Sequence, residues 1–204
     1  MIVHLVRHGE TPHNAGSITL GREDVPLNEL GRRQAAALGV RLAPEPLSVI
    51  YASPLTRARE TARAIAGERD IAVEIRDELI EMDVGETENI PYEEVRRRFP
   101  EFLEAWRGPH PEDVVMPGGE SLRDVAARVD AFLGGLRTVP AEQVVVVTHN
   151  FVLKVLLCRL LEVELSAFRS FTTDVASLST VVLRDGRIAI RVLNDRCHLH
   201  ELES

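Results

Sequence analysis

Three ionisable residues follow directly on a short apolar stretch near the start of the chain. The stretch at 2–6 reads IVHLV, and Arg7, His8 and Glu10 come immediately after it. Charged groups are costly to bury unless they are paired or used. These residues therefore either lie in solvent just beyond a strand or form a site.

A second histidine and a further arginine occupy comparable positions. His149 follows the apolar run at 144–147, and Arg57 follows the run at 47–51 after a short turn. A histidine or arginine beyond a strand is, taken alone, more often a surface residue than a catalyst. Ligands of open α/β sheets, however, bind outside the carboxyl ends of the strands. If the three strands are neighbours, Arg7, His8, Arg57 and His149 meet at one edge of the sheet.

Two histidines and two arginines suit a phosphoryl group better than a metal ion. A divalent cation needs a third ligand and surroundings that are not already positive, whereas guanidinium groups bind phosphate oxygens through paired, charge-assisted hydrogen bonds. A neutral histidine can attack phosphorus, and a carboxyl group with a raised pKa can protonate the leaving group. We therefore expect a phosphoryl site without a metal or other cofactor.

The apolar runs and the helix signals predict how these residues are positioned. Strands are expected at 2–6, 47–51 and 144–147, since these runs are apolar without alternation. Helices are expected at 26–43 with Asn28 as N-cap, at 53–67 with Ser53 as cap, from 121 with a capping box of Ser121 and Asp124, and from Asn150 as cap.

Strands that alternate with helices predict an α/β fold: a mostly parallel sheet between two helical layers. The dipeptide Asp185-Gly186 lies between two strand-like segments and predicts a hairpin, so the sheet should finish with an antiparallel edge strand. The segment at about 88–118 is charged, aromatic and broken by prolines. We expect a single domain over 1–204, with this segment as a helical excursion over the active site.

The composition narrows the class of protein and of partner. Hydrophobic residues make up 45% of the chain and charged residues 27%, which is an ordinary globular balance. The net charge of -8 argues against nucleic-acid binding, so an anionic ligand needs a local cationic cluster. There is no signal-like or membrane-spanning segment, and Cys158 and Cys197 are read as free thiols. We expect a cytoplasmic protein that does not bind membranes.

Several segments, in order, resemble one family. LVRHGET resembles the signature of the histidine phosphatase superfamily, whose fold is phosphoglycerate mutase-like. GREDVPLNELGRRQAAALG, YASPLTRARETA, GGES, VVVVTHNFVLKVLL and LNDRCHL resemble further segments of that family in the same order. The resemblance covers nearly the whole chain.

The resemblance implies roles for individual residues. His8 matches the nucleophile that becomes phosphohistidine, and Glu81 matches the group that protonates the leaving group and then activates water. Four residues match those that hold the phosphoryl group: Arg7, Asn14, Arg57 and His149. Glu10 and Thr11 belong to the signature and are given supporting roles.

Further residues are candidates for contact with the substrate. We expect Gly21 and Asn150 beside it, and Arg22 to reach a second anionic group, although a solvated charge is an equal reading of Arg22. Arg96, Arg97 and Arg98 could also reach such a group, although solvated charges on a helix are the favoured reading of these three residues. Where the family often has Trp-Glu-Gly, this chain has Thr87-Glu88-Asn89, so Glu86 or Glu88 is an alternative to Glu81.

The resemblance covers phosphatases and mutases, and the sequence favours a phosphatase. The Glu-Arg-His-Tyr-Gly and Arg-Arg-Ser-Tyr-Asp segments of cofactor-dependent mutases are missing, and the excursion looks like that of small broad-specificity phosphatases. We therefore expect a phosphomonoesterase acting on a small phosphorylated metabolite. The alternatives are a cofactor-dependent phosphoglycerate mutase and a non-catalytic module that binds phosphorylated ligands. A homodimer is common among similar proteins.

Overall fold

A six-stranded sheet forms the centre of the protein in a computed structural model that describes residues 1–184 and 187–202. The strand order is β3-β2-β4-β1-β5-β6. The strands are β1 (Ile2–Arg7), β2 (Val49–Ala52), β3 (Ala72–Ile75), β4 (Gln143–Thr148), β5 (Leu178–Arg184) and β6 (Arg187–Asp195). The strands predicted at 2–6, 47–51 and 144–147 are thus present, and β4 lies between the other two.

The sheet is parallel through its centre and antiparallel at one edge. β1, β4, β2 and β3 run parallel, while β5 pairs antiparallel with β1 and β6 pairs antiparallel with β5. The predicted antiparallel edge is confirmed, and it consists of the two strands, β5 and β6, that the hairpin pattern predicted. The predicted turn at Asp185-Gly186 lies outside the described residues.

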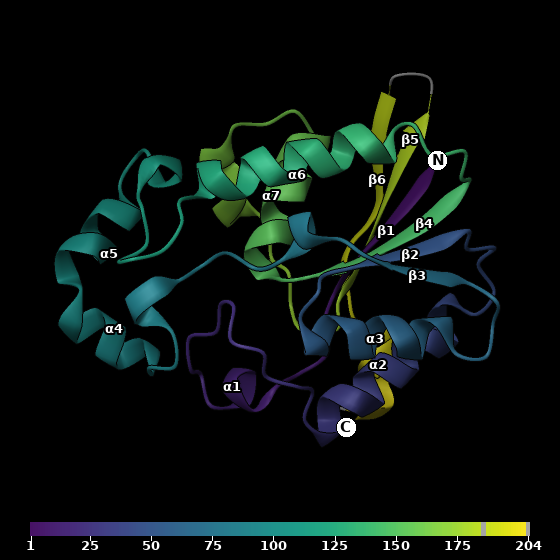
Figure 1. The fold of residues 1–204 in the computed structure, drawn as a ribbon, viewed down its shortest axis with the longest axis horizontal. Coiled ribbons are helices and arrows are strands. Elements are labelled where there is room, and N and C mark those ends of the chain that lie inside the picture. The colour runs from purple at the N-terminus through teal and green to yellow at the C-terminus, as the bar shows by residue number, and fades with distance from the viewer. Residues whose placement is uncertain (185–186, 203–204) are drawn as a thin grey trace.

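Helices cover both faces of the sheet, as predicted (Figure 1). Val144 and Val146 of β4 pack in one core with α6 (Leu122–Leu136) and α7 (Asn150–Leu160). Val145 and Val147 pack in a second core with α2 (Glu29–Leu42) and α3 (Thr56–Ala66). Successive side chains of a strand point to opposite faces, which is why an unbroken run of valines marks a strand buried on both sides.

Two helices begin where their capping residues predict. Asn28 caps α2 by accepting a hydrogen bond from the Gly31 N–H, and Ser121 forms a reciprocal capping box with Asp124 at the start of α6. Each cap satisfies N–H groups that have no partner within the helix.

The caps predicted for two further helices were wrong. Helix α3 begins at Thr56, because Ser53 does not cap it and the Asp24 carboxylate accepts hydrogen bonds from both the N–H and the hydroxyl of Thr56. Helix α7 has His149 as its N-cap, and Asn150 is its first residue, without a side-chain cap. Ser53 and His149 instead face each other, as described below.

Two short elements were not predicted. Strand β3 is only four residues long and partly exposed, so it lacks the apolar run that marks a buried strand. Helix α1 (Pro12–Ala15) is a single turn capped by Thr11, and it carries Asn14. Neither element is long enough to show a periodic pattern.

The segment predicted as an excursion is helical. It contains α4 (Tyr92–Arg98), α5 (Pro100–Arg107) and the 3-10 turn η3 (Pro111–Asp113), which lie at one end of the molecule in Figure 1. Its start is tied to the loop after α1, since Ile18 bridges to Pro91 and the Thr19 N–H donates to the Ile90 carbonyl. The remaining 3-10 turns are η1 (Asp77–Leu79), η2 (Gly85–Thr87), η4 (Leu165–Ser170) and η5 (Cys197–Leu202).

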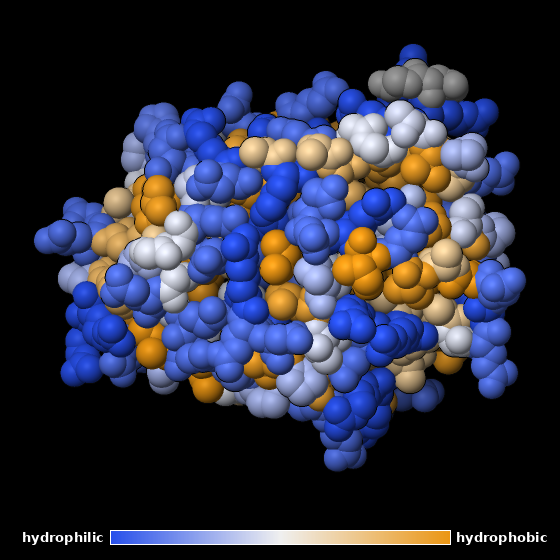
Figure 2. Space-filling model, viewed as in Figure 1, coloured by the Kyte–Doolittle hydropathy of each residue, from blue (hydrophilic) through white to orange (hydrophobic). Residues whose placement is uncertain are grey.

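The surface is mainly polar on the face that Figure 2 shows, with separate apolar patches. Among residues 1–184 and 187–202, no helix combines the length and the apolar character that crossing a membrane requires. Cys158 and Cys197 are both free thiols.

Helix α2 approaches α3 through Gly39, and this contact gives a test of the packing. A Cβ at Gly39 would lie 2.5 Å from the Ala64 carbonyl oxygen, whereas a Cβ at Gly134, in α6, would meet nothing within 4 Å. We expect Gly39→Ala to lower the free energy of unfolding by about 1–3 kcal/mol through overpacking. Gly134→Ala should raise it by about 0.5–1 kcal/mol through helix propensity. Urea unfolding of both variants measures this, and equal stabilities would contradict the packing described.

Candidate active site

A cavity of about 170 Å³ lies at the carboxyl ends of β1 and β4 and holds most of the predicted site residues. Six of them line it: Arg7, His8, Asn14, Arg57, Glu81 and Asn150. Ile18, Thr19, Leu20, Val84 and Phe151 complete the lining. The parallel pairing of β1 with β4, and of β4 with β2, is what brings the three chain segments together.

His8 is held as a neutral imidazole with one nitrogen available. It is 3% exposed, and its Nδ1 lies 2.7 Å from the Gly9 carbonyl oxygen, so Nδ1 carries the proton. Burial, then the charges of Arg57 and Arg7, hold the pKa of His8 well below the usual value. Nε2 is therefore an unprotonated nitrogen with a lone pair, as nucleophilic attack requires.

Arg57 is the most buried charged side chain of the site, at 1% exposed. Its Nη1 and Nη2 donate to the carbonyl oxygens of Glu23 and Gly21, and its Nε donates to His149 Nδ1 at 3.2 Å. Burial lowers the pKa of Arg57 to about 10, so it stays cationic at neutral pH. A guanidinium has five N–H donors, and two remain for a ligand in the cavity.

His149 positions Arg57 from the side of β4. Its Nδ1 accepts from Arg57, and its Nε2 lies 2.7 Å from Ser53 Oγ. Its ring centroid is 5.0 Å from that of His8. Burial and the charge of Arg57 lower the pKa of His149 well below the usual value. Both nitrogens have protein partners, so direct contact between His149 and a phosphoryl group stays a prediction.

Ser53 belongs to the site through its contact with His149, whereas the sequence predicted it only as a helix cap. We predicted it as a helix cap, and it does accept from the Leu55 N–H at 3.3 Å, but its hydroxyl also fixes the imidazole of His149. Its position in YASPLTR, four residues before Arg57, was the available signal.

Arg7 offers a second guanidinium to the cavity. Its Nη1 donates to the Thr173 carbonyl oxygen at 2.7 Å, while its Nε is buried and has no hydrogen-bond partner among the described residues. A buried donor without a partner is costly. An anionic ligand in the cavity would provide that partner.

Glu81 lies in the loop between η1 and η2 and is 3% exposed. Its Oε1 accepts from the Met82 N–H at 2.9 Å and its Oε2 from the Phe151 N–H at 3.3 Å. Burial raises the pKa of Glu81, and this effect outweighs the opposing influence of those two N–H groups and of Arg57. A carboxyl group that keeps its proton closer to neutral pH can act as a general acid.

The two alternatives to Glu81 lie elsewhere. Neither Glu86 nor Glu88 lines the cavity. Glu88 Oε1 accepts from the backbone N–H groups of Gly21 and Glu23, at 2.8 Å each, and so fixes the loop whose carbonyl groups hold Arg57. These positions favour Glu81 as the acid.

Asn14 presents its amide nitrogen to the cavity because its oxygen is already used. The Oδ1 atom accepts from the N–H of Thr11, at 3.0 Å, and from its hydroxyl, at 2.9 Å, within the capping box of α1. The single turn of α1 thus orients Nδ2 as a donor toward an anion.

Of the three remaining residues predicted to contact the substrate, only Asn150 lines the cavity. Asn150 lines the cavity, and its Oδ1 accepts from the Thr173 hydroxyl. Gly21 contributes its carbonyl to Arg57 rather than lining the cavity. Arg22 does not line it either: its Nη2 lies 2.6 Å from Glu120 Oε1 and its Nε donates to the Glu81 carbonyl.

Arg96, Arg97 and Arg98 pair within their own helix. Arg96 pairs with Glu93, while Arg97 and Arg98 pair with Glu94. None of the three lines the cavity. This arrangement agrees with the favoured reading of solvated helix charges.

Phe151 connects the cavity to the excursion through an aromatic cluster. Its ring lies 6.0 Å from that of Trp106, in α5, and 6.4 Å from that of Phe168, in η4. Trp106 and Phe168 are themselves 5.5 Å apart, edge to face. Phe151 therefore both packs helix α7 and forms part of the cavity wall.

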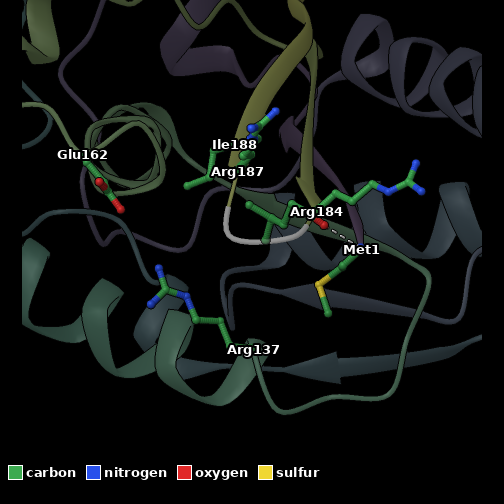
Figure 3. Close-up of a pocket in the computed structure, with 7 residues that line it drawn as sticks. Met1, Arg137, Glu162, Arg184, Arg187 and Ile188 are labelled. Carbon is green, nitrogen blue, oxygen red and sulfur yellow. Dashed lines mark hydrogen bonds between the residues drawn. The ribbon is translucent and has the colours of Figure 1, made fainter.

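A larger cavity lies at the opposite end of the sheet. It has a volume of about 410 Å³ and lies beside Met1, Arg137, Arg184 and Arg187 (Figure 3). It holds no histidine, and the buried His8 and Glu81 are remote from it in the fold. Converging polar groups with shifted pKa values mark the smaller cavity as the candidate site.

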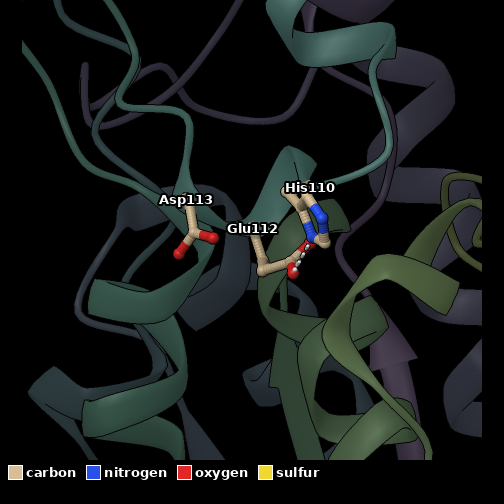
Figure 4. Close-up of side chains that lie close together, drawn as sticks. All are labelled: His110, Glu112 and Asp113. Atoms are coloured by element: carbon tan, nitrogen blue, oxygen red, sulfur yellow. Dashed lines mark ion pairs between the residues drawn. The ribbon is translucent and has the colours of Figure 1, made fainter.

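One group of side chains has the spacing of metal ligands, and it lies outside this cavity. Ligand atoms of His110, Glu112 and Asp113 lie within 4.8 Å of one another (Figure 4). Arg123 pairs with both carboxylates and opposes a cation there. None of the three residues lines the cavity of His8.

Comparison with known proteins identifies the family. Residues 3–196 match the histidine phosphatase superfamily (branch 1), and the chain belongs to that superfamily. It is 40% identical to phosphoserine phosphatase 1 of Hydrogenobacter thermophilus, covering 97% of this chain and 93% of that protein. It is 31% identical to the adenosylcobalamin/alpha-ribazole phosphatase of Salmonella typhimurium, covering 96% and 97% of the two chains.

A solved structure agrees with this assignment. The putative alpha-ribazole-5'-P phosphatase of Escherichia coli superposes with a TM-score of 0.88 at 29% identity, covering 96% of this chain and 97% of that chain. The predicted family and its α/β fold are therefore confirmed. The protein is an enzyme of the phosphatase class.

The protonation of the two histidines can be tested directly. We expect the imidazoles of His8 and His149 to remain neutral at pH 6, since burial and Arg57 oppose a second positive charge. The unfolded chain takes up protons that these groups do not, so stability should fall as the pH drops below about 6.5. Nitrogen-15 NMR of the imidazoles, assigned with His8→Ala, measures this. A midpoint at or above about 6.5 for either ring would contradict the site described.

Proposed function

We propose that the protein is a metal-independent phosphomonoesterase that acts through a phosphohistidine at His8. The observation that carries this proposal is one cavity lined by His8 with its neutral Nε2, by two guanidinium groups with uncommitted N–H donors, and by a buried carboxyl group. Phosphoryl transfer needs positioning and charge stabilisation of this kind.

In the first step, His8 Nε2 attacks phosphorus and the bond from phosphorus to the ester oxygen breaks. Arg7 and Arg57, with the amide of Asn14, stabilise the negative charge on the equatorial oxygens. Glu81 gives its proton to the leaving oxygen, so the alcohol departs neutral and Glu81 becomes a carboxylate.

In the second step, Glu81 takes a proton from water as the water oxygen attacks the phosphorus of phosphohistidine. The bond from phosphorus to Nε2 breaks and inorganic phosphate leaves. The lone pair returns to Nε2, and Glu81 is protonated again for the next cycle. His149 and Ser53 keep Arg57 in place throughout.

The substrate we propose is a small phosphorylated metabolite. The relatives are described as phosphatases of phosphoserine and of alpha-ribazole phosphate, which are both phosphomonoesters of an alcohol. A cavity of about 170 Å³ fits a phosphoryl group and a small part of its alcohol. We also propose a cytoplasmic location, because two free thiols suit a reducing compartment. The homodimer and the single domain with its excursion over the site stay predictions.

The nucleophile is tested by turnover and trapping. We expect release of phosphate from p-nitrophenyl phosphate and O-phosphoserine in the presence of EDTA, and none with His8→Ala, which lacks the attacking nitrogen. Acid-quenched mass spectrometry should locate a phosphoryl group on His8 in the wild type. A stable phosphohistidine without release would favour the phospho-binding module, and transfer to phosphoglycerate rather than water would favour the mutase.

The positive cluster is tested through Arg57. Arg57→Ala should lower kcat/KM by about a hundredfold or more, because a preorganised charge contact in the transition state is lost. Arg63→Ala, at an exposed position of the same helix, is the matched control and should leave kcat/KM unchanged. Similar losses in both variants would argue against a role for Arg57 at the phosphoryl group.

The acid is tested by the dependence on the leaving group. Glu81→Gln cannot donate a proton, so kcat/KM for O-phosphoserine should fall by about 10²–10⁴-fold while p-nitrophenyl phosphate, whose leaving group needs no proton, is affected much less. Glu86→Gln, at an acidic residue that does not line the cavity, is the comparison variant and should change neither rate. Equal losses on both substrates would remove Glu81 as the acid.

A further inference from the structure

The loop that carries Glu81 is clamped from several elements at once. Thr148, at the end of β4, donates its hydroxyl to the Leu79 carbonyl at 2.6 Å, and Arg128 of α6 donates to the Glu78 carbonyl at 2.8 Å. Arg22 Nε donates to the carbonyl of Glu81 itself at 3.2 Å. These bonds fix the main chain just before Glu81 and at Glu81 itself.

Glu120 connects these clamps to one another. Its Oε1 accepts from Arg22 Nη2 at 2.6 Å, and its Oε2 accepts from the Asp83 N–H at 3.0 Å and from Arg128 Nη2 at 3.4 Å. Its own N–H donates to the Asp83 carbonyl at 2.9 Å. One carboxylate thus joins the loop of Glu81 to the two arginines that hold that loop.

Two glycines make this contact possible. A Cβ at Gly119 would lie 2.3 Å from the Asp83 carbonyl oxygen, and a Cβ at Gly85 would lie 2.1 Å from the Pro117 carbonyl oxygen. Gly85 also has a φ of +53°, which side chains with a Cβ rarely adopt. The main chain around Glu120 therefore packs directly against the loop, with no room for a side chain between them.

The charge of Glu120 matters as much as its position. Arg22 and Arg128 both lie close to Glu81, and Glu120 is the carboxylate with which both pair. Cations also face Glu81 from the other elements around it: Arg7 from β1, Arg57 from α3 and Lys154 from α7. Asp83 is the further acidic group, 3.6 Å from Arg22. Without Glu120, Arg128 would lose its ion pair and Arg22 would keep only Asp83, and the additional net positive charge near Glu81 would favour its ionised form.

We propose that Glu120 is a positioning residue for Glu81, because its carboxylate anchors the loop of Glu81 and neutralises Arg22 and Arg128. This role rests on the proposed function, in which Glu81 must be protonated to release an alcohol. Glu120 touches neither the cavity nor the reacting atoms, so it acts through the loop and the local charge.

The test compares Glu120→Gln with the wild type on two probes. On β-glycerol phosphate, whose alcohol needs a proton, we expect kcat/KM at pH 7.5 to fall by about tenfold or more. The alkaline limb of its pH profile should also move to lower pH, since Glu81 ionises earlier. On p-nitrophenyl phosphate, kcat/KM should fall by less than about threefold, because that leaving group does not depend on the acid.

Two further variants separate this role from a loss of structure. Glu120→Asp keeps the negative charge but shortens the side chain, so it should restore the alkaline limb even where kcat/KM stays low. Asp130→Asn in α6, which removes a carboxylate paired with Arg159 of α7, should leave both probes unchanged. Thermal unfolding of every variant accompanies the assays. If Glu120→Gln does not fold, the pH profiles of Glu120→Asp and Arg22→Gln decide. Neither variant removes a negative charge near Glu81, so a shift of the alkaline limb to lower pH in both would overturn the proposal.

Equal losses on both probes with an unmoved alkaline limb would overturn the proposal, as would wild-type behaviour of Glu120→Gln. Failure of the proposed function would look different. The wild type itself would then release no phosphate from either probe.

Discussion

The buried guanidinium of Arg57 is the interaction on which the rest of the site depends. Removing a charge from water is costly unless other groups replace its hydration. Two carbonyl oxygens from residues 21–23 and the imidazole of His149 do so here, and Ser53 and Glu88 hold those partners. The resulting fixed positive charge draws an anion to a protein whose net charge is -8. Together with burial, which is the larger cause, it keeps the neighbouring imidazoles neutral.

The same charge creates a conflict at Glu81. Arg57 and Arg7 add to burial in keeping the imidazole of His8 neutral, but they also favour the ionised form of Glu81. Burial is the larger influence at Glu81 and raises its pKa. Thr148, Arg22 and Arg128 hold the loop that buries Glu81, so its raised pKa depends on main-chain contacts made by residues outside the cavity.

The cavity has two sides of different origin. The cationic side is built from strand ends and the first turn of α3, which the sheet fixes rigidly. The other side is built from Ile18, Leu20 and Phe151, and Phe151 packs against Trp106 of the excursion. Loops and short helices tolerate change better than a buried sheet does. The side formed by Ile18, Leu20 and Phe151 should therefore tolerate substitution better than the cationic side does.

The sequence by itself determined the layers of the fold and most residues of the site. Unbroken valine runs identify strands buried on both faces, and Arg7, His8, Arg57 and His149 follow such strands or the next turn. The sequence misassigned the caps of α3 and α7. It left β3 and α1 unseen, because a single turn or a four-residue strand has no period to read. Only the tertiary structure decided that Ser53 faces His149 and that Arg22 pairs with Glu120. Glu81, too, rather than Glu86 or Glu88, reaches the cavity. These outcomes depend on contacts between segments far apart in the chain, and local patterns carry no information about such contacts.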